Sequence, residues 1–365
     1  MKNSFKSVFF FLLTTFIILI FTFTIGEIFL RIFSIPGVGL EVNIYNEQLG
    51  LIHAKPNSTF IRTNIRGEKI KRKANNFGFY DKQVKPSNTK GIFKIGFFGD
   101  SFTESIQVPL EKTFFRIIED SLNIQNIKTL AFGKSGHGTF HAYLKYKYFS
   151  SILKIDKVVY VFFRNDVYDQ YYPIKKTNQL PYPEIQNGDI ISNDKLLKQY
   201  IATENNKFIK KIFKNSYLYQ NSILLQTLNK RLYFLRNYGI SLANKKDEIN
   251  NNEFKSTEFR ETAKRLFEAV ILNWKYECYK NKQEFSIFYV PDKGKYIEKD
   301  LDEFSFKPWL KSFCNDYDID FIDPSNSFLK LEKKGGVIYD DHFSELGHLA
   351  FASTFVKKFR EERNE

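Results

Sequence analysis

The sequence predicts a three-layer α/β protein, in which a doubly wound, mainly parallel sheet of five strands lies between helices. Five short apolar runs, rich in β-branched and aromatic residues, read as buried strands. Between them lie segments whose apolar residues recur at helical spacing. Because strands and helices alternate, the strands run parallel and both faces of the sheet are covered. An uncharged run, residues 7–26, adds a membrane helix before this domain.

The run 7–26 is long enough to span a membrane. About twenty apolar residues in a helix cross a hydrocarbon core of about 30 Å. The run continues into Glu27 without an Ala-x-Ala-like cleavage site, so we expect a retained transmembrane anchor over residues 1–34 that contacts membrane lipid. Lys2 and Lys6 precede the run and only Arg31 closely follows it. This charge difference predicts that the rest of the chain lies on the extracytoplasmic side.

The chain after the anchor divides into a juxtamembrane segment, residues 35–90, and an α/β domain, residues 91–365. The first segment is rich in Asn, Lys and Pro and is expected to form strands and loops. The α/β domain is interrupted by a helical insertion at 173–254, within which Lys195–Asn237 reads as a basic amphipathic helix. At 365 residues, the chain can bury a sizeable core.

The first strand of the domain begins at Phe93 and ends in Gly99-Asp100-Ser101. Ligands of open α/β sheets gather at the carboxyl ends of strands, where Ser101 is expected to lie. A serine hydroxyl at such a place is a candidate nucleophile once a base accepts its proton. An ordinary turn uses the same three residue types.

The next two strands each end in groups that can donate hydrogen bonds. Ile127–Phe132 is followed by a glycine-dense loop in which the Gly136 N–H is unobstructed by side chains. Lys157–Phe163 is followed by Asn165, which carries a side-chain amide. Such donors stabilise the oxyanion of acyl transfer. A plain connection and an Asx turn are the alternative interpretations.

The last candidate site residue is His342, which follows Asp340 and Asp341 and precedes an apolar helical pattern. An Asp two residues before a His can accept its ring N–H and fix its tautomer, which assigns this role to Asp340. Asp341 competes for it, and spacing does not separate the two. A solvated turn with a helix cap explains the same residues. The predicted elements before this motif are Phe259–Tyr279, Glu284–Val290, Pro308–Asp316 and Asp318–Asp323.

In this order, the four blocks resemble the SGNH/GDSL hydrolase superfamily. The resemblance implies a flavodoxin-like fold, Ser101 as nucleophile, Asp340 and His342 as its partners, and an oxyanion hole made by the Ser101 N–H, Gly136 and Asn165. Two positions depart from the family pattern: Phe163 stands where glycine is usual, and Ala131 where asparagine is common. The Glu27-x-x-Leu30-Arg31 sequence resembles the membrane-anchored bacterial branch of this superfamily.

These observations predict a serine esterase or deacylase that acts on an O-acyl ester, of a cell-envelope glycan or a lipid-linked sugar. Acyl transfer at the same site and a non-catalytic module of an envelope polysaccharide system are the alternatives. The net charge of +14 fits contact with anionic lipid or an acidic glycan, and a solvated helix face explains it equally well; no nucleic-acid-binding motif accompanies it. No metal-ligand spacing occurs, so we expect no metal or cofactor. Pairing of Cys278 with Cys314 and the oligomeric state stay open.

Overall fold

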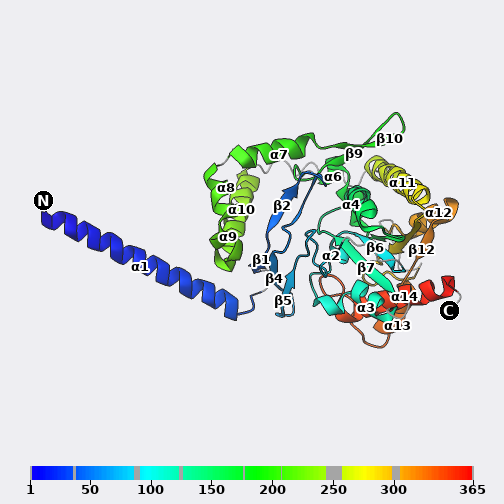
Figure 1. Ribbon diagram of the computed structural model, residues 1–365, viewed down its shortest axis with the longest axis horizontal. Helices are drawn as coiled ribbons and strands as arrows, with labels where there is room; N and C mark the ends of the chain where they lie inside the picture. The colour runs from blue at the N-terminus through cyan, green and yellow to red at the C-terminus, as the bar shows by residue number, and fades with distance from the viewer. Residues whose placement is uncertain are drawn as a thin grey trace. The chain divides into compact units, whose positions relative to one another are not determined.

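The computed structural model describes residues 2–35, 38–85, 91–122, 126–175, 177–206, 208–243, 257–297 and 305–363. The chain divides into two compact units, whose elements are labelled in Figure 1. The first unit comprises Met1–Glu41, Phe60–Lys71 and Lys207–Asp247, and the second comprises Val42–Thr59, Arg72–Asn206 and Glu248–Glu365.

The second unit contains the five-stranded sheet, with strand order β12-β11-β8-β6-β7. Every neighbouring pair in this sheet is parallel, which confirms the predicted fold class. The strands span β6 Phe93–Gly99, β7 Ile127–Gly133, β8 Lys157–Phe162, β11 Glu284–Tyr289 and β12 Asp320–Ile322.

Alternate side chains of the central strands enter two separate cores. In β8, Tyr160 and Phe162 belong to one cluster of buried residues, while Val159 and Val161 belong to the other. Successive residues of a strand point to opposite faces. Every residue of β8 is buried, and after Lys157 at its start the strand is a continuous apolar and aromatic run that does not alternate in polarity.

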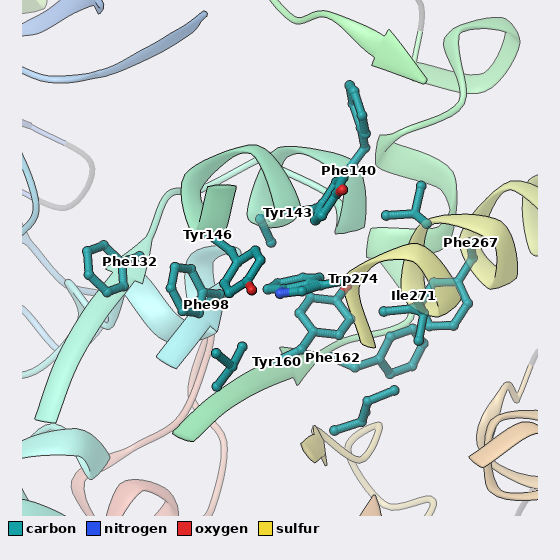
Figure 2. Close-up of a cluster of buried hydrophobic side chains, with 14 of the residues drawn as sticks. Phe98, Phe132, Phe140, Tyr143, Tyr146, Tyr160, Phe162, Phe267, Ile271 and Trp274 are labelled. Atoms are coloured by element: carbon teal, nitrogen blue, oxygen red, sulfur yellow. The ribbon is translucent and has the colours of Figure 1, made fainter. Parts of the chain in front are cut away.

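The helices cover the two faces. On the first face, α4 (Thr139–Leu153), α11 (Thr257–Lys280) and α12 (Lys307–Asp316) contribute to the cluster around Trp274 (Figure 2). The fully buried indole lies with its ring centroid 5.4 Å from Tyr160 and 5.8 Å from Phe98. On the second face, α3 (Phe114–Ser121), α13 (Ser325–Glu332) and α14 (Glu345–Glu362) pack around Phe97 and Phe351. The sheet is therefore doubly wound.

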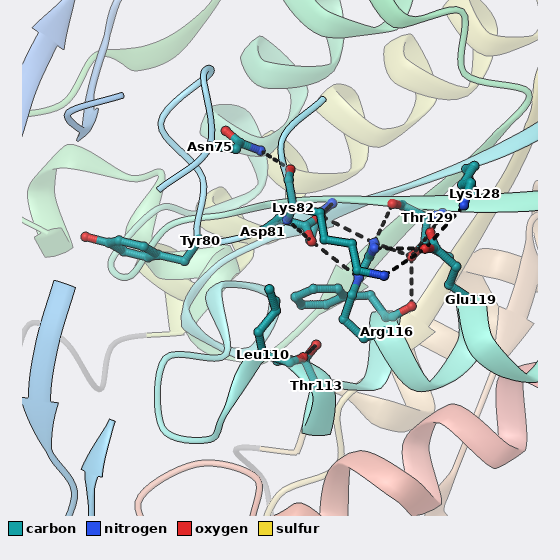
Figure 3. A network of polar contacts seen from close by, with 12 residues as sticks. Asn75, Tyr80, Asp81, Lys82, Leu110, Thr113, Arg116, Glu119, Lys128 and Thr129 are labelled. Atoms are coloured by element: carbon teal, nitrogen blue, oxygen red, sulfur yellow. Dashed lines mark hydrogen bonds and ion pairs between the residues drawn. The ribbon is translucent and has the colours of Figure 1, made fainter. Parts of the chain in front are cut away.

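Buried ionic side chains satisfy the edge of β7, which has a strand on one side only (Figure 3). Arg116 donates to the Thr129 carbonyl, Glu119 Oε2 accepts the Thr129 N–H at 2.8 Å, and Asp81 Oδ2 accepts the Ala131 N–H at 3.1 Å. Arg116 forms ion pairs with both carboxylates. These side chains replace a neighbouring strand, and they fix the strand that leads into the glycine loop.

Short elements complete the second unit. A hairpin of β9 (Tyr182–Gln186) and β10 (Asp189–Asn193) was not predicted from the sequence. Its signal is Asn187-Gly188, since both residues have positive φ, 52° and 87°, as a two-residue type I′ turn requires. The remaining elements are β2 (Asn43–Asn46), β3 (Leu51–Ala54), α2 (Ser101–Glu104), η1 (Leu110–Lys112), α5 (Asn165–Asp169), α6 (Tyr172–Lys175) and α7 (Lys195–Asn206).

The first unit consists of α1 (Lys2–Ile32), a three-stranded sheet and three helices. The sheet order is β1-β4-β5, with β1 Gly39–Leu40, β4 Thr59–Thr63 and β5 Lys69–Lys73. The helices are α8 (Phe208–Asn215), α9 (Tyr217–Asn221) and α10 (Ile223–Ala243). Val38, Leu40 and Ile223 form its small core. Residues 6–32 of α1 form the one candidate membrane span among the described residues, with none of its most apolar window buried.

The structure differs from the single helix expected over Lys195–Asn237. Four helices, α7 to α10, occupy this stretch. Ser216 interrupts it because its Oγ accepts the Tyr219 N–H at 3.2 Å, and Ser222 because its Oγ accepts the Leu225 N–H at 3.0 Å. Serine side chains compete with the helical backbone in this way and favour helix starts.

Candidate active site

Ser101 lies at a tight junction between β6 and α2. Asp100 is the N-cap of α2, and its Oδ1 accepts the Phe102 N–H at 2.9 Å. A Cβ on Gly99 would lie 2.4 Å from Thr103 Oγ1 and 2.8 Å from the Val161 carbonyl oxygen, so only glycine fits there. The serine is therefore the first residue of a helix at the carboxyl end of a central strand.

His342 lies next to this serine, although 241 positions separate them in the sequence. Its Nε2 is 2.7 Å from Ser101 Oγ. The loop that carries His342 is closed by a backbone bridge between Tyr339 and Phe343, both buried. Phe102 packs against the imidazole with ring centroids 4.9 Å apart. The aromatic residues around the loop thus orient the ring toward the hydroxyl.

Two carboxylates accompany the histidine. Asp341 Oδ2 lies 3.5 Å from His342 Nδ1, at ion-pair distance. The Asp340 backbone N–H donates to the His342 carbonyl at 2.9 Å, which curls the chain at this point. Both Asp340 and Asp341 line one cavity with Ser101 and His342. The Asp341 carboxylate therefore lies within ion-pair distance of the ring, while the sequence pattern favours Asp340 as the residue that orients it.

The cavity beside Ser101 has a volume of about 330 Å³ and is lined mostly by polar and charged residues. Two of them, Arg164 and Asp292, form an ion pair with Nε 3.1 Å from Oδ1. This carboxylate partly neutralises the positive charge of the guanidinium. The lining consists of Ser101, Phe102, Phe163, Arg164, Asn165, Asp292, Lys293, Tyr339, Asp340, Asp341 and His342.

Of the expected oxyanion donors, Asn165 reaches the cavity and Gly136 is absent from its lining. Asn165 begins α5, directly after β8, and its Nδ2 donates to Asp169 Oδ2 at 2.9 Å. The same side chain also interacts with Asp100. Gly136 has φ of 78°, which explains the glycine. The structure thus brings Ser101, Asn165 and His342 together around one cavity.

Glu104, which sequence reasoning missed, connects the nucleophile helix to the glycine loop. Its carboxylate accepts the Ser135 N–H at 2.9 Å and the Ser135 hydroxyl. It also pairs with Lys134 Nζ at 3.1 Å, and the Glu104 side chain is 1% exposed. A Cβ on Gly133 would lie 2.0 Å from the Glu104 nitrogen, so α2 and the loop are in close contact.

Lys145 is a fully buried lysine beneath the serine. Its Nζ donates to the Gly99 carbonyl at 2.8 Å. Burial lowers its pKa to about 7, and the nearby carboxylates of Glu104, Asp166 and Asp100 oppose this shift. Burial likewise raises the pKa of Asp100 to about 6. Burial therefore shifts the pKa of Lys145 and the pKa of Asp100 toward neutrality from opposite directions.

The other four histidines are buried and structural. His348 Nδ1 accepts the Phe114 N–H at 3.3 Å, and burial lowers its pKa to about 3. Burial also lowers the pKa of His53, His137 and His141. None of these four histidines is among the residues that line the cavity with Ser101 and His342. Cys278 and Cys314 are buried free thiols, and burial raises the pKa of each to about 12.

No protein-family model and no curated protein matches the chain. Three similar solved structures each match 73% of this chain. A member of the lipolytic protein G-D-S-L family from Veillonella parvula is 12% identical, with 98% of that chain covered and a TM-score of 0.39, and a catalytic mutant of an acetylxylan esterase from Geobacillus stearothermophilus is 14% identical, with 93% covered and a TM-score of 0.38. An alpha/beta hydrolase from a Lake Arreo metagenome in Spain is 10% identical, with 94% covered and a TM-score of 0.39. Similarity at this level carries no conclusion about activity, which has to come from the geometry of the site.

Proposed function

We propose that this chain is a membrane-anchored serine ester hydrolase of the SGNH type. The observation that carries the proposal is the distance of 2.7 Å between His342 Nε2 and Ser101 Oγ. A serine hydroxyl becomes a useful nucleophile only when a base within hydrogen-bond reach accepts its proton. The position of Ser101 at the end of a central strand supports the same role.

In the proposed reaction, Ser101 Oγ attacks the ester carbonyl while His342 accepts the hydroxyl proton. The imidazolium then protonates the leaving alcohol, and water releases the acyl group from the serine by the same route. Asp340 or Asp341 orients the ring from its Nδ1 side. The Ser101 N–H and Asn165, which line the cavity, are the proposed oxyanion donors; for Gly136, which does not line it, this role rests on the sequence pattern alone. The Asn165 amide already interacts with the carboxylates of Asp169 and Asp100. A developing oxyanion would therefore compete with one of these carboxylates for an N–H of the amide.

For the substrate, we propose a short acyl ester on a polar sugar of the cell envelope. Sites for long acyl chains are lined mainly by apolar side chains. Of the described residues that line this cavity, only Phe102, Phe163 and Tyr339 carry large apolar rings, and none is aliphatic. The charged side chains around them favour the hydroxyl groups of a glycan. Lys2 and Lys6 before the apolar helix favour an extracytoplasmic position of the site.

The proposal is tested with the full-length protein purified in detergent. We expect it to hydrolyse p-nitrophenyl acetate and acetylated oligosaccharides, with little action on p-nitrophenyl palmitate. Ser101→Ala should abolish turnover, whereas Ser353→Ala, at an exposed position of α14, should match the unmodified protein. Undiminished turnover in Ser101→Ala would refute the proposal. A folded protein that turns over no ester would favour the non-catalytic module.

A further inference from the structure

The helices of the first unit carry large apolar side chains that the described residues leave exposed. Seven of them, on α8, α9 and α10, are at least 43% exposed. Contiguous exposed apolar surface on a protein marks a site that contacts another molecule or a membrane. The residues are Ile212, Phe213, Tyr217, Leu218, Leu228, Leu232 and Leu235.

On α10, this surface is a stripe along one side of the helix. Leu224, Leu228, Leu232 and Leu235 follow one another at intervals of four, four and three residues, which places them on one face. The opposite side of α10 faces its own unit, since the Gln226 side chain accepts the Glu41 N–H at 2.9 Å. The stripe therefore points away from the core of the first unit.

The stripe begins where α10 meets the end of α1. A Cβ on Gly26 would lie 3.1 Å from Leu224 Cδ2. Glu27 accepts the Ser222 hydroxyl at 2.8 Å and the Leu224 N–H at 3.0 Å, so its carboxylate caps α10. Arg31 donates to the Asn221 carbonyl at 2.5 Å. These contacts fix the first turn of α10 beside the last residues of α1.

This junction sets the depth of α10 relative to a bilayer. The uncharged run 7–26 is about 30 Å long as a helix, the thickness of the hydrocarbon core. Glu27 is the first charged residue after it and therefore lies at the interface. Because Glu27 caps α10, the start of α10 lies at the same level. Lys230 and Arg231 are exposed on α10, and α10 is not itself a candidate span.

We propose that α10 is an interfacial helix, whose Leu228, Leu232 and Leu235 insert into the surface of the membrane that α1 spans. Helices with an apolar stripe and basic residues lie in the interface with the apolar side several ångströms deep. Arg231 flanks the stripe on the helical wheel and can extend to anionic headgroups. The proposed insertion of α10 requires that α1 spans a bilayer, and it does not require any activity at Ser101.

The test compares two positions that lie about 160° apart around α10. Leu232→Cys and Lys230→Cys are labelled with an NBD fluorophore in the full-length protein, which is then placed in vesicles of phosphatidylcholine and phosphatidylglycerol. Both native cysteines are buried, and the labelled unmodified protein gives the background. Leu235→Cys repeats the measurement on the stripe. Quenching by iodide reports water, and quenching by lipid spin-labelled near the headgroup reports the interface.

We expect the label at position 232 to be quenched several-fold more by the spin-labelled lipid than the label at 230, and several-fold less by iodide. Equal iodide quenching at both positions would place the stripe in water and overturn the proposal. Protection from both quenchers at 232 and 235 would also overturn it, because protein, such as a second copy of the chain, would then cover the stripe.

Discussion

Replacing Lys145 by methionine should change how the stability of the protein depends on pH. In the folded protein burial lowers the pKa of this amine from 10.5 to about 7. The unfolded chain keeps the proton up to about pH 10.5. Between these values the unfolded state binds one more proton, so the free energy of unfolding rises with pH, by up to about 1.4 kcal/mol per pH unit.

From pH 7 to pH 9, Lys145 should therefore add about 2 kcal/mol to the free energy of unfolding. The Lys145 charge lowers the pKa of Asp100, so the difference between the two proteins reports the lysine together with this coupled carboxyl. In a unit of this size, about 2 kcal/mol corresponds to roughly 4–8 °C in Tm. The Tm of the unmodified protein should rise by this much more than that of Lys145→Met.

The assay is thermal unfolding of the full-length protein in detergent at pH 7, 8 and 9, followed by tryptophan fluorescence. Trp274 is buried in the same core as α4, which carries Lys145, so the signal reports this unit. Lys147→Met, which replaces an exposed lysine two residues further along α4, is the matched control. The same pH dependence in Lys145→Met and the unmodified protein would refute the electrostatic reasoning.

Three further predictions concern turnover of whichever ester proves active. If the residue two before His342 orients the ring, Asp340→Asn should lower kcat far more than Asp341→Asn; the reverse order would assign the role to Asp341, as the 3.5 Å contact suggests. Asn165→Ala should lower kcat by roughly a hundredfold with little change in KM, and an unchanged kcat would remove Asn165 from the oxyanion hole. Glu104→Gln should lower kcat and reduce the free energy of unfolding, measured by chemical denaturation, by about 2 kcal/mol, because Lys134 loses its carboxylate partner. An unaltered kcat in this variant would contradict the positioning role of Glu104.

The sheet could be predicted from the sequence because its strands are buried on both faces. Such strands are mainly apolar runs, and the predicted and observed bounds differ by at most two residues at either end, as with Asp318–Asp323 and β12. The residues that end these strands could be predicted as well, since parallel strands bring their carboxyl ends to one edge. For the same reason Ser101 and Asn165, which follow two neighbouring strands, are expected close together, and both line the cavity.

The polar contacts beneath the site could not be predicted. Glu104 and Lys145 occupy helices in which a charged residue normally faces solvent. Their burial depends on how α2 and α4 pack against the sheet, and no local pattern encodes that packing. The choice between Asp340 and Asp341 is of the same kind, because it depends on the turn between Tyr339 and Phe343. The β9–β10 hairpin, in contrast, had a local signal in Asn187-Gly188.

The central claim is that His342 activates Ser101 for attack on an acyl carbon. Its most direct test is a fluorophosphonate probe, which reacts covalently with serines activated in this way. After reaction with the full-length protein, peptide mass spectrometry should find the adduct on Ser101 alone, and His342→Ala should prevent it while His348→Asn leaves it in place. An unlabelled Ser101 in the folded protein, or equal labelling in His342→Ala, would contradict the account.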